Sequence, residues 1–485
     1  NDDGATSNRD LLLTAGMGSV DLQSDVGGAT PLEMFTVASA TQADLADVSV
    51  ELTISVTGTN IDLNGNTYSS TDDAITFTGA VDLDAASAAI TVTSGGAAGD
   101  DITFTGTIED PGSNNELYLV AGSGNVELQS NAGGTNALSR FEVTSAVQAD
   151  LANVAATGAH FVTATNIDLN GTSYLSADGT MVYNGAVDLE SAGLVTFDSD
   201  TNDDGVDGGV QITGTVSDPG SNSSLTIDAD DGQVDIANIA VNGALSVTGG
   251  NIDLNGTSYS SNDGAIAFFS PVDLIGAGIS IDSDANSDAT DGNISFSSTI
   301  DGNQTLALDA DTGTVSLNGN VGDATAISSL TVSAASQADL AGITTNGNTD
   351  VTATNIDLNG TAYTSNNSSI LLTGNVDLDS SGVLAITSGM GTNDDITVTG
   401  VMNDTGSNSD LELIAGSGNV DLQSNAGGTG PLNRFEVTSA MQADLANVAT
   451  TGAHFVTATN IDLNGTSYQS EDGTMVYVGP VDLES

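Results

Sequence analysis

Two Asp-rich segments contain the residue types and spacings that most clearly suggest chemistry. The first matches the opening half of a calcium-binding loop, D-x-N-x-D-G, in which oxygen ligands at alternate positions wrap one cation and Gly205 permits a sharp turn. The bidentate Glu typical of the twelfth position is missing, because Gln211 stands there. The second segment occupies the matching place in the next repeat. The predicted ligands of a structural Ca²⁺ are Asp198, Asp200, Asn202, Asp204 and Asp207 in the first segment, and Asp282, Asp284, Asn286, Asp288 and Asp291 in the second.

An acidic, solvated loop is the alternative interpretation of both segments. The corresponding loops of two other repeats, residues 95–101 and 389–395, are shorter and contain fewer oxygen ligands. Calcium binding would therefore be local and not a property of every repeat. Stacked carboxylates would favour cations more generally, because like charges about 5 Å apart repel by on the order of 1 kcal/mol per pair.

Other polar residues recur at equivalent places in the repeats. His160 and His454 both lie in GAHF, which indicates a repeated structural position and not a catalytic one. Arg140 and Arg434 both lie in L-x-R-F-E-V, where pairing with the nearby Glu142 or Glu436 is expected. Asn-Gly-Thr matches the glycosylation acceptor pattern, but we expect these sites to be unmodified. These sites are Asn170, Asn255, Asn359 and Asn464.

The charge balance excludes several classes of function. The 485 residues include 65 Asp and Glu but only three Arg and no Lys, for a formal net charge of −62. Such a chain cannot neutralise phosphates, so nucleic acid and anionic lipid surfaces are not expected partners. Hydrophobic residues still make up 38%, in an ordered pattern, which argues against disorder. No Cys is available for disulfides, and no run of 18 apolar residues predicts a membrane span.

Internal repeats determine the organisation of the chain. The hexapeptide Asn-Ile-Asp-Leu-Asn-Gly occurs five times, so the chain is a tandem array with a period of about 105 residues and one unit about 20 residues short. A second period of about 20 residues lies inside each unit, and the short unit has lost about one such sub-repeat. A solenoid can drop one coil and restack, whereas a closed domain cannot. The hexapeptides begin at Asn60, Asn166, Asn251, Asn355 and Asn460.

These periods predict an all-β fold, a parallel β-helix (β-solenoid) with about 20–23 residues per coil and a higher-order repeat of about 105 residues. Within NIDLNG, Ile61 and Leu63 are expected to face the core and Asp62 the solvent. The core is expected to be thin, with little space for aromatic rings. We expect one continuous solenoid over residues 1–485, with repeat units at about 1–59, 60–165, 166–250, 251–354, 355–459 and 460–485.

The succession of these motifs resembles the long β-strand-repeat regions of giant bacterial surface proteins, similar to filamentous-haemagglutinin-like adhesins. The resemblance is carried by DITFTGTI (101–108), LALDADTGTVSLNG (306–319), SLTV (329–332) and GNVDL (374–378). It implies a β-helical shaft, export to the cell surface, and a role in adhesion or matrix building. The extreme acidity without Lys departs from that pattern and suggests a saline or calcium-rich setting.

The expected function is that of an extracellular structural rod or filament, forming a cell-surface fibre, shaft or adhesin stalk that self-associates end to end or laterally. No enzymatic activity is expected, because a catalytic site normally interrupts a pattern, whereas the acidic features here recur in register. Two alternatives remain open. One is a carbohydrate- or ice-binding solenoid that uses Thr-x-Thr steps such as Thr91–Thr93. The other is a tandem array of calcium-binding immunoglobulin-like domains.

Overall fold

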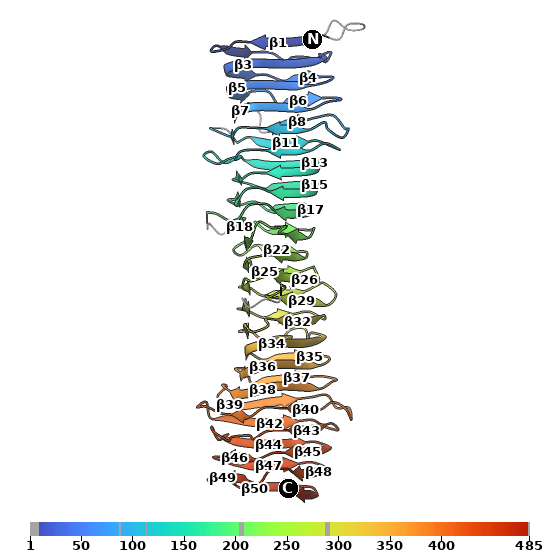
Figure 1. Cartoon of the computed structure of the whole chain (residues 1–485), viewed down its shortest axis with the longest axis vertical. Coiled ribbons are helices and arrows are strands. Elements are labelled where there is room, and N and C mark those ends of the chain that lie inside the picture. The colour runs from blue at the N-terminus through green and yellow to red at the C-terminus, as the bar shows by residue number, and fades with distance from the viewer. Residues whose placement is uncertain (1–8, 87–88, 113, 203–207, 287–291, 484–485) are drawn as a thin grey trace. The chain divides into compact units, whose positions relative to one another are not determined.

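The computed structural model describes residues 9–86, 89–112, 114–202, 208–286 and 292–483. The chain divides into two compact units. The first contains Asn1–Asn242 and Thr248–Gly250, and the second contains Gly243–Val247 and Asn251–Ser485. Both consist of β-strands joined by turns, with the strands of successive coils side by side (Figure 1).

The strands of the first unit recur regularly along the chain and range from 2 to 12 residues. They are β1 (Asp10–Thr14), β2 (Ser19–Leu22), β3 (Met34–Leu45), β4 (Val48–Val50), β5 (Ile54–Leu63), β6 (Thr67–Ser70), β7 (Ile75–Leu83), β8 (Ala89–Thr93), β9 (Ile102–Phe104), β10 (Ile108–Glu109), β11 (Glu116–Val120), β12 (Val126–Leu128), β13 (Arg140–Leu151), β14 (Val154–Ala156), β15 (His160–Leu169), β16 (Ser173–Ser176), β17 (Met181–Leu189), β18 (Gly193–Asp198), β19 (Val210–Ile212), β20 (Val216–Ser217), β21 (Ser223–Asp228), β22 (Gln233–Ile236) and β23 (Ile239–Val241).

The second unit repeats this arrangement and includes the first three residues of β24. Its strands are β24 (Leu245–Thr248), β25 (Asn251–Leu254), β26 (Ser258–Ser261), β27 (Ile266–Phe268), β28 (Val272–Leu274), β29 (Ile279–Asp282), β30 (Ile294–Phe296), β31 (Ile300–Asp301), β32 (Thr305–Asp309), β33 (Thr314–Leu317), β34 (Ser329–Leu340), β35 (Ile343–Thr345), β36 (Thr349–Leu358), β37 (Ala362–Ser365), β38 (Ile370–Leu378), β39 (Gly382–Thr387), β40 (Ile396–Val398), β41 (Met402–Asn403), β42 (Ser409–Ile414), β43 (Asn419–Leu422), β44 (Arg434–Ser439), β45 (Gln442–Leu445), β46 (Val448–Thr450), β47 (His454–Thr457), β48 (Asn460–Leu463), β49 (Tyr468–Ser470), β50 (Met475–Val478) and β51 (Val481–Leu483).

Within each unit, described strands pair in parallel with strands one coil further along the chain, which confirms the predicted β-solenoid. The tightest steps are 18 residues, as between Gln42 and Asn60. Wider steps, such as the 29 residues from Asp188 to Ser217, contain loops inserted between strands. The described pairs run parallel, so the antiparallel sheets of an immunoglobulin-like sandwich are excluded.

The core forms because alternate residues of each strand point inward. Ile61 and Leu63 are fully buried on either side of the partly exposed Asp62, as expected. The expectation that the core has little space for aromatic rings is wrong. Rings stack from coil to coil inside it, as Phe77 does on Phe104 with centroids 5.0 Å apart. In-register stacking places each ring against the ring of the next coil, so even a narrow interior accommodates them.

The 105-residue repeat is out of phase with the coils. From Ile61 the same ladder runs through Val81, Ile108, Ala132 and Val154 to Tyr174. Tyr174 therefore lies five coils after Ile61 on the same ladder. The counterpart of Ile61 in the next repeat is Ile167, which lies in β15, one strand before Tyr174 in β16. One repeat is thus one strand shorter than five complete coils. In the second unit, Ile356 and Ile461 show the same offset. Equivalent residues of successive repeats within a unit therefore lie on different faces.

Candidate functional site

The first Asp-rich segment begins at Asp198, the last residue of β18, and the Oγ of the next residue, Ser199, donates a hydrogen bond to the Gly208 carbonyl oxygen (2.9 Å). Asp198 accepts a hydrogen bond from the backbone nitrogen of Asp200 (3.2 Å). Asn202 donates from its side-chain nitrogen to Asp178 Oδ1 of the preceding coil (2.6 Å). Asp200 is 4% exposed, and within the described part of the chain neither of its carboxylate oxygens has a hydrogen-bond partner.

The second segment follows β29 with the same local structure. Ser283 Oγ donates to the Gly292 carbonyl oxygen (3.0 Å), and the Asp284 backbone nitrogen donates to Asp282 Oδ1 (3.0 Å). Asn286 reaches Asp263 of the preceding coil (2.9 Å). The structure thus brings the first two Asp of each segment together.

The rest of the predicted ligand set is not assembled in the described residues. Asp204, Asp207, Asp288 and Asp291 lie outside them. Within those residues, no group of three or more His, Cys, Asp or Glu side chains is arranged to hold a metal ion. Sequence reasoning also missed that the following coil places Asp228 beside Asp198 and Asp309 beside Asp282. Comparing the turns of successive repeats would have shown these residues.

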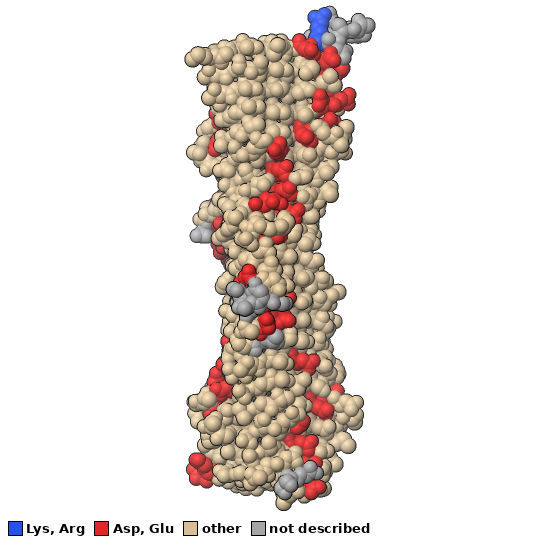
Figure 2. Space-filling model, viewed as in Figure 1, with Lys and Arg blue, Asp and Glu red and all other residues tan. Residues whose placement is uncertain are grey.

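A ladder of carboxylates runs along the outer face of the first unit. Asp44, Asp62 and Asp82 are register partners on consecutive coils. Amide side chains separate them: Gln42 donates to Asp44 Oδ1 (2.7 Å), and Asn60 donates to Asp82 Oδ2 (3.0 Å). Burial, followed by the neighbouring Asp44 carboxylate, raises the pKa of Asp62 to about 6, despite the hydrogen bond from Gln42. Figure 2 shows Asp and Glu side chains gathered in streaks on the face in view.

We predict that Asp62→Asn stabilises the chain at pH 7.5 by about 1 kcal/mol, the Coulomb energy of one unit-charge pair about 4 Å apart in water. Because the folded pKa lies above the ordinary value of 3.8, protonation favours the folded state, and this contribution is lost as the pH rises through 6. The gain should therefore vanish near pH 4, as measured by urea unfolding. Glu51→Gln, at an exposed turn, is the control. Equal gains at both pH values would contradict the ladder explanation.

A second ladder borders an acidic hollow of about 590 Å³ in the first unit. Gln148 bridges Asp150 and Asp168 with bonds of 2.7 and 2.6 Å. Burial and the Asp150 charge raise the pKa of Asp168 to about 6. Such a surface attracts cations and repels anionic ligands. Its carboxylates are Glu127, Asp150, Asp168 and Glu190.

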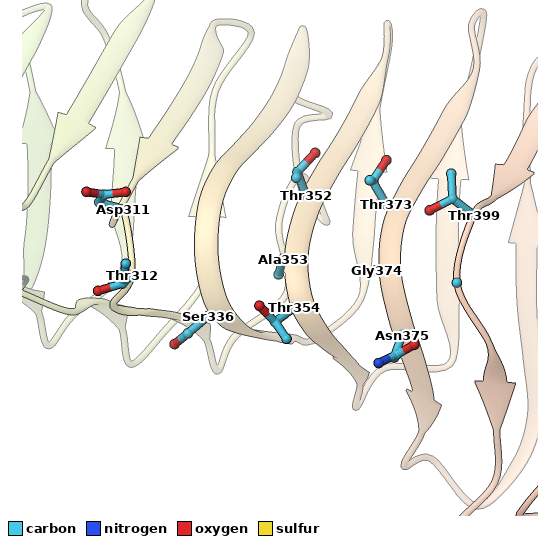
Figure 3. Close-up of a pocket in the computed structure, with 11 residues that line it drawn as sticks. Asp311, Thr312, Ser336, Thr352, Ala353, Thr354, Thr373, Gly374, Asn375 and Thr399 are labelled. Atoms are coloured by element: carbon cyan, nitrogen blue, oxygen red, sulfur yellow. The ribbon is translucent and has the colours of Figure 1, made fainter.

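A groove of about 540 Å³ in the second unit has a different chemistry (Figure 3). Thr352 and Thr373 are register partners there, and Thr399 follows on the next coil. The strands bulge between Thr352 and Asn355, and Gly374 adopts φ of +142° beneath the Ala353 carbonyl. The result is a shallow depression lined by hydroxyl groups, small residues, the Asn375 amide and the Asp311 carboxylate, without a general acid–base pair among these residues.

The two histidines occupy core positions, in agreement with a structural role. His160 and His454 are fully buried, and burial lowers the pKa of each to about 4. His454 packs edge-on against Phe435, with ring centroids 5.1 Å apart. Neither ring nitrogen of His454 has a hydrogen-bond partner among the described residues.

The repeated arginines form local ion pairs, as expected. Arg140 donates from Nε to Glu142 Oε2 (3.1 Å), and Arg434 pairs with Glu436. The Arg140 guanidinium also lies over the ring of Phe161, 4.6 Å from its centroid. Each ion pair lies within one strand, whereas the contacts of Arg140 with Phe161 and of Arg434 with Phe455 join neighbouring strands.

No family model, curated protein or solved structure matches the chain. The described part contains no helix with the length and hydropathy of a membrane span. The parallel strand pairing shows a β-solenoid fold.

Proposed function

We propose that this chain is a non-enzymatic structural protein of the cell surface or extracellular matrix, serving as a stiff β-solenoid shaft or filament. The observation that supports it best is the continuity of the strand ladders within each unit. In the first unit, Phe35 pairs with Ile54, Ile54 with Ile75, and Ile75 with Ile102, each through parallel backbone pairing. Hydrogen bonds along the stacking direction resist bending without disulfides.

The polar residues favour a structural over a catalytic role. The histidines are in the core, the arginines pair locally, and the hydroxyl-lined groove has no general acid–base pair. A hydrolase acting on polysaccharides would use a unique pair of carboxylates. In this chain the carboxylates recur in ladders, as do Asp44 and Asp62.

The proposed location and partners follow from surface chemistry. A net charge of −62 and the absence of Cys suit an extracellular protein that does not rely on disulfides. Exposed strand edges pair with matching strands, so end-to-end or lateral association into fibres is the proposed mode of assembly. A cell-surface stalk similar to filamentous-haemagglutinin-like adhesins is consistent with the repeated strands and the proposed assembly, while the extreme acidity suggests a saline or calcium-rich setting.

Electron microscopy of the purified chain tests the shaft directly. We expect straight particles of uniform width whose length grows by about 4.8 Å for each coil. Variants with one coil removed or added supply a matched length series. Flexible strings of beads, or lengths that do not change across the series, would contradict a shaft.

Carbohydrate or ice binding is the second candidate, favoured by the hydroxyl ladder of Thr352, Thr373 and Thr399 (Figure 3). Threonine hydroxyls both donate and accept hydrogen bonds, as sugar hydroxyls and water do. Binding on a glycan array, or thermal hysteresis, would separate this function from a purely structural one.

A further inference from the structure

Four strand-to-turn junctions have the same backbone plan but two distinct compositions. In each, the last residue of one strand pairs with the last residue of the strand one coil later. Two junctions have no charge at the four central positions, and two have Asp at all four. The uncharged sets are Thr93, Gly95, Val120, Gly122 and Thr387, Gly389, Ile414, Gly416; the charged sets are Asp198, Asp200, Asp228, Asp230 and Asp282, Asp284, Asp309, Asp311.

The backbone shows that the charged sets are unfavourable by themselves. Asp230 and Asp311 adopt φ of 49° and 45°, a left-handed conformation that an L-residue occupies at a cost. Glycine occupies the same conformation in the uncharged junctions, with φ of 60° at Gly122 and 58° at Gly416. Asp therefore occupies a position where glycine would adopt the backbone conformation at lower cost, and three further Asp residues belong to the same junction.

The loops facing these turns differ in the same two junctions. In the uncharged ones the loop is short, and its own amides satisfy its carboxylate: Ala97 donates to Asp100 (2.7 Å) and Gly391 to Asp394 (2.6 Å). In the charged ones, the second Asp of every D-x-D turn donates its backbone nitrogen to the first.

The carboxylates of the charged junctions lie on register-paired strands of consecutive coils. At one junction, Asp282 and Asp309 are register partners, and the backbone nitrogens of Asp284 and Asp311 donate to them. At the other junction, Asp200 is 4% exposed and neither carboxylate oxygen has a hydrogen-bond partner in the described residues. A buried carboxylate is strongly unfavourable unless it is paired or coordinates a metal.

We propose that each pair of stacked D-x-D turns binds one hard divalent cation, Ca²⁺, between consecutive coils. Ca²⁺ takes six to eight oxygen ligands in flexible geometry, so carboxylates on neighbouring strands suit it. The described side chains are not already arranged around one point, so binding requires them to rotate toward the ion. The ligands come from two coils and not from one linear loop, and the side chains of Asn202 and Asn286 donate hydrogen bonds to the preceding coil. The proposal rests on the fold and is independent of the proposed function.

Substitution by the residue of the uncharged junctions tests the proposal. Calorimetric titration of the full chain with CaCl₂ should show two tight sites, one in Asp230→Gly, one in Asp311→Gly, and none in the double variant. Loss of one ligand should weaken a site by ~10-fold or more. In EDTA the variants should melt at or above the wild-type temperature, because repulsion and left-handed strain are both relieved. The Tm increase that CaCl₂ produces in the wild type should be absent from the double variant.

Asp150→Asn, in the carboxylate ladder, is the matched control and should retain both tight sites. Unchanged stoichiometry in the double variant would overturn the proposal and assign the ions to the ladders. A wild-type chain whose Tm is the same in EDTA and in CaCl₂ would also overturn it. Melting of Asp230→Gly far below the wild type in EDTA would show that the Asp side chain has an ion-independent structural role, which also contradicts the proposal.

Discussion

Deleting residues 167–186 should leave a cooperatively folded chain, whereas deleting only residues 167–176 should destabilise it by more than about 4 kcal/mol, the range of severe core disruption. The longer deletion joins Asn166 to Val187, the register partner of Ile167, so every ladder closes with one coil fewer. The shorter deletion places Ala177 and Gly179 at the buried positions of Ile167 and Leu169, and shifts the following residues relative to the core.

Urea unfolding followed by circular dichroism measures both deletions. The 20-residue deletion should show a single transition near that of the full chain. The 10-residue deletion should show a broad transition at much lower urea concentration, or none. Similar stability of the two variants would mean that the coils are not interchangeable layers, and would contradict the nearest-neighbour stacking that defines a solenoid.

Replacing His160 and His454 by isoleucine should protect the chain against acid. The folded pKa of each is lowered from 6.5 to about 4, so the unfolded state binds protons first as the pH falls from 6.5 toward 4. The free energy of unfolding therefore falls by on the order of 3 kcal/mol for each fully buried histidine as the pH is lowered to about 4. Ile54 occupies the equivalent position six residues before the first hexapeptide, so isoleucine fits the site.

Thr349→Ile is the matched control, because Thr349 is buried at the same repeat position but does not titrate there. Thermal melting from pH 4 to pH 8 should show a pH-dependent gain for the histidine variants and a pH-independent change for the control. The raised pKa of Asp62 and Asp168 acts in the opposite direction over this range. The difference between the wild type and each variant isolates the histidine contribution. An equal gain at pH 4 and pH 8 would contradict this explanation.

The fold could be predicted because each coil of a solenoid repeats the same inward and outward positions, so the sequence repeats with the length of a coil. Alternation in NIDLNG indicated that Ile61 and Leu63 face inward, and the structure confirms it. The aromatic content of the core could not be judged in the same way. Ring stacking between Phe77 and Phe104 depends on register between coils, which composition does not contain.

For a similar reason, the sequence alone identified only half of the proposed ligands of each candidate cation site. A linear motif identified Asp198 and Asp200, because their spacing follows a familiar loop. Asp228 and Asp230 lie in the next coil, in a turn that appears ordinary by itself. Their importance emerges only when the register places Asp228 beside Asp198, and when Gly122 is seen at the position equivalent to Asp230.

The offset between repeat and coil limits how such a chain can meet its neighbours. In the second unit, Asn251, Asn355 and Asn460 begin the same hexapeptide on three different ladders. A flat partner approaching one flank encounters just one of these three copies. Partners on different sides of this unit would each contact one copy of the hexapeptide, at different positions along the stack of coils. Bundling through this motif would therefore be omnidirectional and favour a three-dimensional mesh over a planar sheet.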